Sequence, residues 1–67
     1  MALIKRVSKR LKRLRVERGL SQQALASKAK ISRGYLARLE AAEQDPTLGV
    51  LERLAKALGV LVTALVA

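Results

Sequence analysis

The sequence contains no cysteine, no histidine and no tryptophan, and its single aromatic residue is Tyr35. Because cysteine is absent, neither a disulfide nor a thiolate metal site can stabilise the fold. Because histidine is absent, the chain also lacks the usual general base near neutral pH and the commonest metal ligand. These absences argue against an enzyme, and we expect neither a cofactor nor a bound metal.

The composition that remains favours helices. Leu, Val and Ala supply almost all of the apolar residues, and Lys, Arg, Glu and Gln dominate the polar ones. A domain of this size buries only about 60% of the surface that its unfolded chain exposes, so association between copies would add stability. We therefore expect one all-α domain that spans residues 1–67.

Positive charge is concentrated in the first half of the chain. Residues 1–38 contain twelve Lys and Arg against one acid, whereas residues 39–67 contain two bases and four acids. Apart from a merely solvated basic face, this imbalance indicates a polyanionic partner, either nucleic acid or an anionic membrane. No secretory signal is evident, and the apolar run at residues 60–67 is shorter than the ~20 residues that span a bilayer, so we expect a cytoplasmic protein.

Apolar spacing and capping residues divide the first forty residues into helices. Val7, Leu11 and Leu14 recur at the spacing of one buried helical face, and Gly19 is suited to end that helix. Ser21 and Ser32 are good N-cap residues for two further helices, which we expect at about 21–29 and 32–41.

Two more helices are expected after a loop. Pro46 disfavours helix at the residue before it, Thr47 is suited to cap the next helix, and Gly59 is suited to end it. The apolar residues that follow predict a last short helix at about 62–66. No internal repeat and no linker interrupts the chain, which again indicates a single domain.

In this order and at these spacings, the motifs resemble the Cro/repressor-type helix-turn-helix family of phage and bacterial regulators. The matching segments are residues 14–22, 25–26, 31–40, 46–48 and 54–60. The resemblance implies a compact five-helix repressor-like bundle in which the second and third helices form the helix-turn-helix motif. It also implies a nucleoid-associated, repressor-like transcriptional regulator that binds double-stranded DNA at a palindromic operator.

The resemblance places three base-contacting positions on the third helix, at Arg33, Gly34 and Arg38. The arginine fork suits guanine, because it can satisfy O6 and N7 together, and phosphate contact or simple solvation is the alternative for each arginine. Gly34 departs from the polar residue that is usual there. Glycine has no side chain to contact a base, and it costs ~1 kcal/mol of helix propensity relative to alanine. It does allow the backbone to approach DNA closely.

Phosphate contacts are expected from Gln22, Ser32 and Tyr35. Gln22 matches the family position at the start of the second helix, where free N–H groups and a partial positive charge favour an anion. A plain surface glutamine is the alternative for Gln22, and packing against the second helix is the alternative for Tyr35.

Arg15 and Glu40 match a family pair that forms a partly buried salt bridge between the first and third helices, which would set the angle of the recognition helix. Lys30 and Ala42 stand where the family usually has glycine, and a left-handed lysine would be strained. The loop that follows the third helix is acidic where many relatives are basic. We therefore expect the basic first helix and the start of the second to hold the DNA backbone.

An exposed apolar strip near the end of the chain predicts an interface between two copies. Leu61 and Ala64 replace polar residues that are usual in the family. Val62, Leu65 and Val66 are needed for the core, and we also place Leu65 in the interface. A two-fold homodimer would set its recognition helices ~34 Å apart, one turn of DNA.

Three other functions compete with this one. An antitoxin of a toxin–antitoxin pair, which would bind a toxin protein and also repress its own operon, has the same fold. A cationic membrane-active helix is favoured only by the amphipathic residues 3–14 and leaves the rest of the chain without a role. Binding of RNA would lack the aromatic stacking platforms that single strands prefer.

Overall fold

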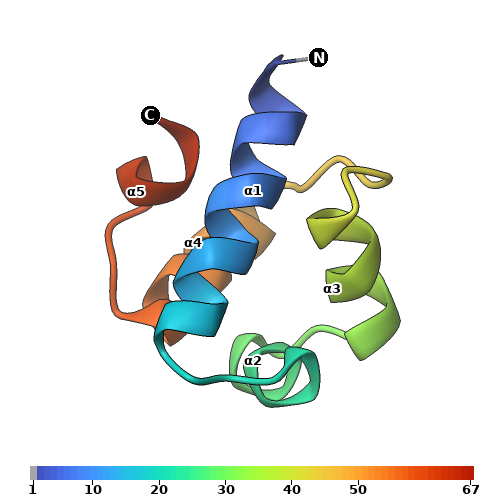
Figure 1. Cartoon of the computed structure of the whole chain (residues 1–67), viewed down its shortest axis with the longest axis vertical. Coiled ribbons are helices and arrows are strands. Elements are labelled where there is room, and N and C mark those ends of the chain that lie inside the picture. The colour runs from blue at the N-terminus through green and yellow to red at the C-terminus, as the bar shows by residue number, and fades with distance from the viewer. Residues whose placement is uncertain (1) are drawn as a thin grey trace.

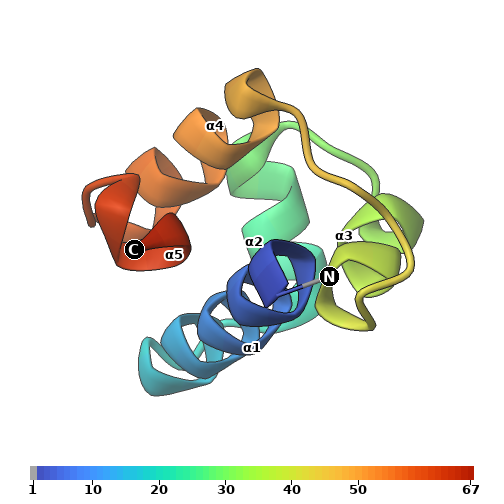
Figure 2. The same ribbon diagram turned by 90° about the horizontal axis from the view of Figure 1, so that it is seen from above.

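The computed structural model describes residues 2–67, and this part of the chain contains five helices and no strand, as an all-α fold predicts. The helices are α1 (Ala2–Glu17), α2 (Gln22–Ala29), α3 (Arg33–Glu40), α4 (Leu48–Leu58) and α5 (Thr63–Val66). Figure 1 shows α1 along the length of the molecule, with α3 and α5 on either side and α2 crossing at its foot. Seen from above, α4 and α5 lie on the opposite side of the molecule from α3 (Figure 2).

The core receives one fully buried leucine from each helix. These residues are Leu11, Leu25, Leu36, Leu54 and Leu65. α2 packs against both α3 and α4, while α1 packs against α3 and α5, so the shortest helices gain their stability from their neighbours. Such a core fixes α3 by one face and leaves its other face at the surface.

The predicted N-caps are present in the structure. The hydroxyl oxygens of Ser21, Ser32 and Thr47 each accept a hydrogen bond from a backbone N–H three residues later, at 3.0, 3.0 and 3.1 Å. Gly19 and Gly59 adopt left-handed backbone conformations, with φ of 67° and 72°, and end α1 and α4. Local chemistry therefore defines where the helices begin and end.

Two residues other than glycine also have positive φ. Lys30, which follows α2, and Ala42, which follows α3, both have φ of 60°. The Lys30 N–H donates to carbonyl oxygens near the end of α2, so the left-handed residue serves as a helix C-cap. This conformation costs roughly 1–2 kcal/mol for a residue with a Cβ atom, so glycine would suit both positions better.

Three arginines use their guanidinium groups to hold helix C-termini. Arg18 donates to the Leu58 carbonyl at 2.6 Å, and Arg53 donates to the Ala29 carbonyl at 3.0 Å. Arg6 donates more weakly to the penultimate backbone carbonyl of the chain, at 3.4 Å. A cation at a helix C-terminus interacts favourably with the helix dipole. Part of the positive charge therefore stabilises the fold.

Candidate nucleic-acid interface

α3 lies at the surface with its apolar face inward and its cationic face outward. Leu36 and Leu39 are buried, whereas Arg33, Gly34 and Arg38 are exposed. These three positions are the ones predicted to contact bases. A Cβ atom added at Gly34 would lie 3.7 Å from Nη1 of Arg38, so the Arg38 guanidinium reaches back along the helix over the glycine. The exposed face of α3 therefore presents two cationic side chains, with the Arg38 guanidinium close to the backbone of Gly34.

Arg15 and Glu40 form a buried ion pair between α1 and α3. Arg15 donates to Glu40 through Nε at 2.6 Å and through Nη2 at 3.0 Å. The two side chains are only 12% and 4% exposed. The same arginine donates through Nη1 to the Leu20 carbonyl at 2.8 Å. The guanidinium thus joins the end of α3 to α1 and to the turn before α2.

Gln22 joins the hydrogen-bond network of Arg15 and Glu40, a contact that the sequence did not predict. Its Nε2 donates to Oε1 of Glu40 at 3.1 Å, so the amide is half-buried and directed at the carboxylate. No sequence signal indicates this contact, because the two residues are far apart in the chain and each has a plausible separate role. In this arrangement, the part of Gln22 that remains suited to an anion is its backbone N–H at the start of α2.

The other two predicted phosphate-contacting residues lie at the start of α3. Ser32 is exposed, and its hydroxyl accepts a hydrogen bond from the Tyr35 N–H. Tyr35 itself is half-buried and packs against the apolar core, which agrees with the packing alternative for its ring. The two N-terminal turns, of α2 and of α3, offer backbone N–H groups that can bind an anion.

The predicted dimer strip is only partly at the surface. Leu61 is 78% exposed and Ala64 is half-buried, but Leu65 is completely buried. Leu65 does not belong to an interface, because its side chain fills the core between α5 and the other helices. The expected place of Leu65 in the core is confirmed, and its place in the interface is wrong.

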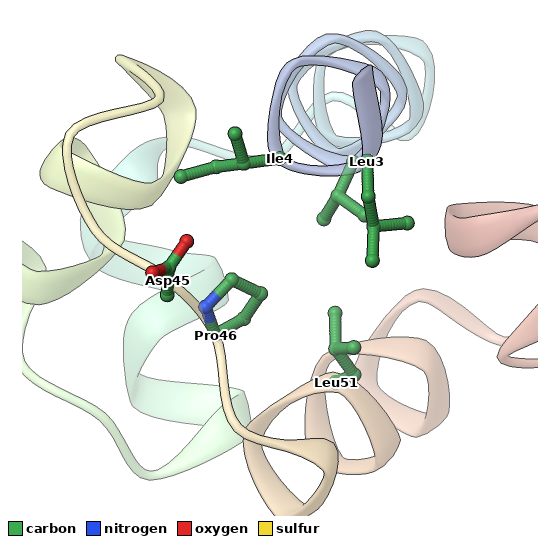
Figure 3. A pocket seen from close by; sticks show the side chains of 6 residues that line it. Leu3, Ile4, Asp45, Pro46 and Leu51 are labelled. Atoms are coloured by element: carbon green, nitrogen blue, oxygen red, sulfur yellow. The ribbon is translucent and has the colours of Figure 1, made fainter. Parts of the chain in front are cut away.

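An apolar groove lies between the start of α1, the loop before α4, and α4 itself. It has a volume of about 390 Å³ and is lined by Leu3, Ile4, Val7, Asp45, Pro46 and Leu51. Figure 3 shows the labelled side chains facing one another across this opening. None of the residues predicted to contact DNA lines the groove, so the two surfaces are separate.

Neither a metal site nor a membrane span is found among the described residues. No group of three or more carboxylates is placed to hold a metal ion in residues 2–67. Within the same range, no helix has the length and apolar character needed to cross a bilayer.

Together, the fold and the exposed helix define a helix-turn-helix scaffold. Residues 11–65 match the family model described as helix-turn-helix, and the chain belongs to this family. The chain is 48% identical over 60 residues to the immunity repressor protein of Bacillus phage phi105, a match that covers 90% of this chain and 42% of that repressor. It thus spans about two fifths of the repressor's length.

Two further relatives agree with this assignment. The chain is 40% identical over 60 residues to the uncharacterized HTH-type transcriptional regulator y4dJ of Sinorhizobium fredii, covering 90% of this chain and 78% of the regulator. The restriction-modification controller protein C.AhdI of Aeromonas hydrophila has the same fold, with a TM-score of 0.93 and 31% identity over 97% of this chain and 98% of the controller. The predicted resemblance and the five-helix fold are confirmed.

Proposed function

We propose that the chain binds double-stranded DNA sequence-specifically and regulates transcription in the manner of a repressor, at a palindromic operator. The observation that carries this proposal is α3, whose leucines are buried while Arg33, Gly34 and Arg38 form its exposed face. The matched relatives are named as a phage repressor and a transcriptional regulator, which supports the same function. No catalytic step is part of the proposal, and a nucleoid-associated, cytoplasmic protein would suit it.

The arginines of α3 would read bases while the helix N-termini position the duplex. Each guanidinium can donate to both O6 and N7 of a guanine, which discriminates against other bases by about 1–3 kcal/mol. The N-terminal turns of α2 and α3, with Gln22, Ser32 and Tyr35, would bind phosphates on either side of the groove. The Arg15–Glu40 pair touches no DNA in this proposal and keeps α3 at its angle.

Selection of bound sequences from a random duplex pool tests this function directly. We expect a two-fold symmetric consensus that contains guanine. Arg33→Ala and Arg38→Ala should then reduce the ratio of operator affinity to random-DNA affinity by about 5- to 150-fold, the equivalent of 1–3 kcal/mol. Equal losses on both DNAs would show that these arginines bind phosphate only. Recovery of no consensus at all would refute sequence-specific binding.

Binding at a palindrome calls for two copies, and the exposed Leu61 with its neighbour Ala64 would form their contact. Light scattering on the eluting protein should give the mass of a dimer at micromolar concentration, and Leu61→Lys should shift it to monomer. The same apolar surface would serve the second candidate function, an antitoxin that holds a toxin protein. Co-purification of a second small protein encoded beside this chain, in place of a homodimer, would favour that function.

A further inference from the structure

Four cationic side chains line a concave surface beside the turn between α2 and α3. Lys28 comes from the last turn of α2 and Lys30 from the turn itself, whereas Arg53 and Lys56 come from α4. Together they line a depression of about 310 Å³, and we call this set the elbow cluster. The hydrogen bond from Arg53 Nε to the Ala29 carbonyl joins α4 to the end of α2 beneath the cluster.

No carboxylate within the described residues forms an ion pair with the elbow cluster. Within residues 2–67, the ion pairs are Arg13–Glu17 and Arg15–Glu40, and neither involves the cluster. The C-terminus of α2 contributes a partial negative charge of only about half an electron. That charge offsets only a small part of four cations, so the surface attracts anions.

Lys30 adds a second and independent observation. Its backbone is left-handed, with φ of 60°, at a position where glycine would carry no strain. The side chain is exposed and contributes nothing to the core, so the folded structure gains no packing in return for the strain. Strained residues of this kind concentrate at functional surfaces.

We propose that the elbow cluster binds phosphate groups of the duplex beyond the end of the half-site that α3 contacts. This inference rests on the proposed function. Lys30 lies two residues before Ser32, which caps α3, so the cluster adjoins the N-terminal end of the helix expected in the groove. Duplex DNA carries one negative charge per ~1.7 Å, and several lysines spread over an open surface suit such a polyanion better than one small anion. The cluster thus increases the length of DNA that the protein contacts and adds no sequence specificity.

The experiment compares one selected operator in two lengths, the operator alone and the same operator with about one helical turn of unrelated sequence added at each end. The variant Lys28→Gln/Lys30→Asn/Lys56→Gln removes three charges, keeps Arg53 because of its backbone contact, and uses asparagine because it tolerates a left-handed backbone. The control Lys5→Gln/Lys9→Gln/Lys12→Gln removes the same charge from the exposed surface of α1, which is expected to hold the backbone of the operator itself, so it should weaken binding to both duplexes equally and keep the difference between them.

The wild-type protein should bind the extended duplex more tightly than the short one, with a steeper salt dependence. Each phosphate contacted changes the slope of log K against log salt by about 0.9, so three lysines account for about 2.7 per subunit. The triple variant should lose this gain and bind the short duplex as the wild type does, whereas the control should retain the gain. Circular dichroism before each titration shows that both variants are folded.

Three results would overturn the inference. In the first, the triple variant still binds the extended duplex more tightly than the short one. In the second, it loses affinity equally for both duplexes. In the third, the control loses its preference for the extended duplex to the same degree as the triple variant. In each case the wild-type protein still binds the operator, so the proposed function stands while the elbow cluster fails. Absence of wild-type binding to either duplex would refute the function itself and the inference with it.

Discussion

The buried ion pair between α1 and α3 offers the sharpest test of how the fold holds the recognition helix. Glu40→Ala removes the carboxylate that accepts hydrogen bonds from Arg15 and Gln22, and it leaves a guanidinium that is only 12% exposed without its partner. Breaking a buried pair in this way costs about 3–5 kcal/mol.

This loss is large for a protein of this length. At roughly 0.05–0.15 kcal/mol per residue, a chain of 67 residues has a free energy of unfolding of about 3–10 kcal/mol. One kcal/mol corresponds to about 4–8 °C in the Tm of such a small domain, so Glu40→Ala should lower the Tm by at least about 12 °C. Thermal and urea unfolding followed by circular dichroism measure the change.

The surface pair Arg13–Glu17 supplies the matched control. Its atoms are 3.9 Å apart and its side chains are 63% and 56% exposed, so Glu17→Ala should cost no more than about 0.5 kcal/mol. The double variant Arg15→Met/Glu40→Leu, which removes both charges, should recover much of the stability. A Glu40→Ala loss no greater than that of Glu17→Ala would refute the argument that burial makes this pair important.

Two backbone substitutions should instead stabilise the protein. Lys30→Gly relieves the left-handed lysine and should raise the free energy of unfolding by about 1 kcal/mol in urea titrations, and a decrease would contradict the strain argument. Gly34→Ala should also add about 1 kcal/mol, because the new methyl group would lie 3.7 Å from the Arg38 guanidinium, an ordinary contact distance. A loss of DNA affinity in that more stable variant would show that the backbone at Gly34 approaches the duplex closely, whereas unchanged affinity would exclude this role.

The parts of the fold that could be predicted from sequence are those set by short-range chemistry. Ser21, Ser32 and Thr47 cap helices through bonds to residues three positions later, and Gly19 and Gly59 end them through their own backbone. Such interactions need no knowledge of the rest of the molecule, so the helix boundaries in residues 20–60 agree with the pattern closely.

The features that could not be predicted depend on how helices distant in the chain meet. Gln22 donates to Glu40 only because α2 begins where α3 ends in space, and no local pattern encodes that proximity. The apolar pattern predicted that Leu65 is needed for the core, but only the packing of α5 on α1 shows that Leu65 is excluded from the proposed interface. The contacts of Arg18 and Arg53 with helix C-termini were missed for the same reason.

The start of α1 and the last residue, Ala67, lie at the same end of the molecule, remote from α2 (Figure 1). The contact of Arg6 with the Val66 carbonyl ties these two regions together. A fluorescent protein or a dimerising module fused at either terminus would therefore emerge on the far side from α2 and leave the α2–α3 surface accessible. Such fusions suit tests of the α2–α3 surface, but a module at the C-terminus adjoins Ala64 of the proposed dimer contact and can disturb it.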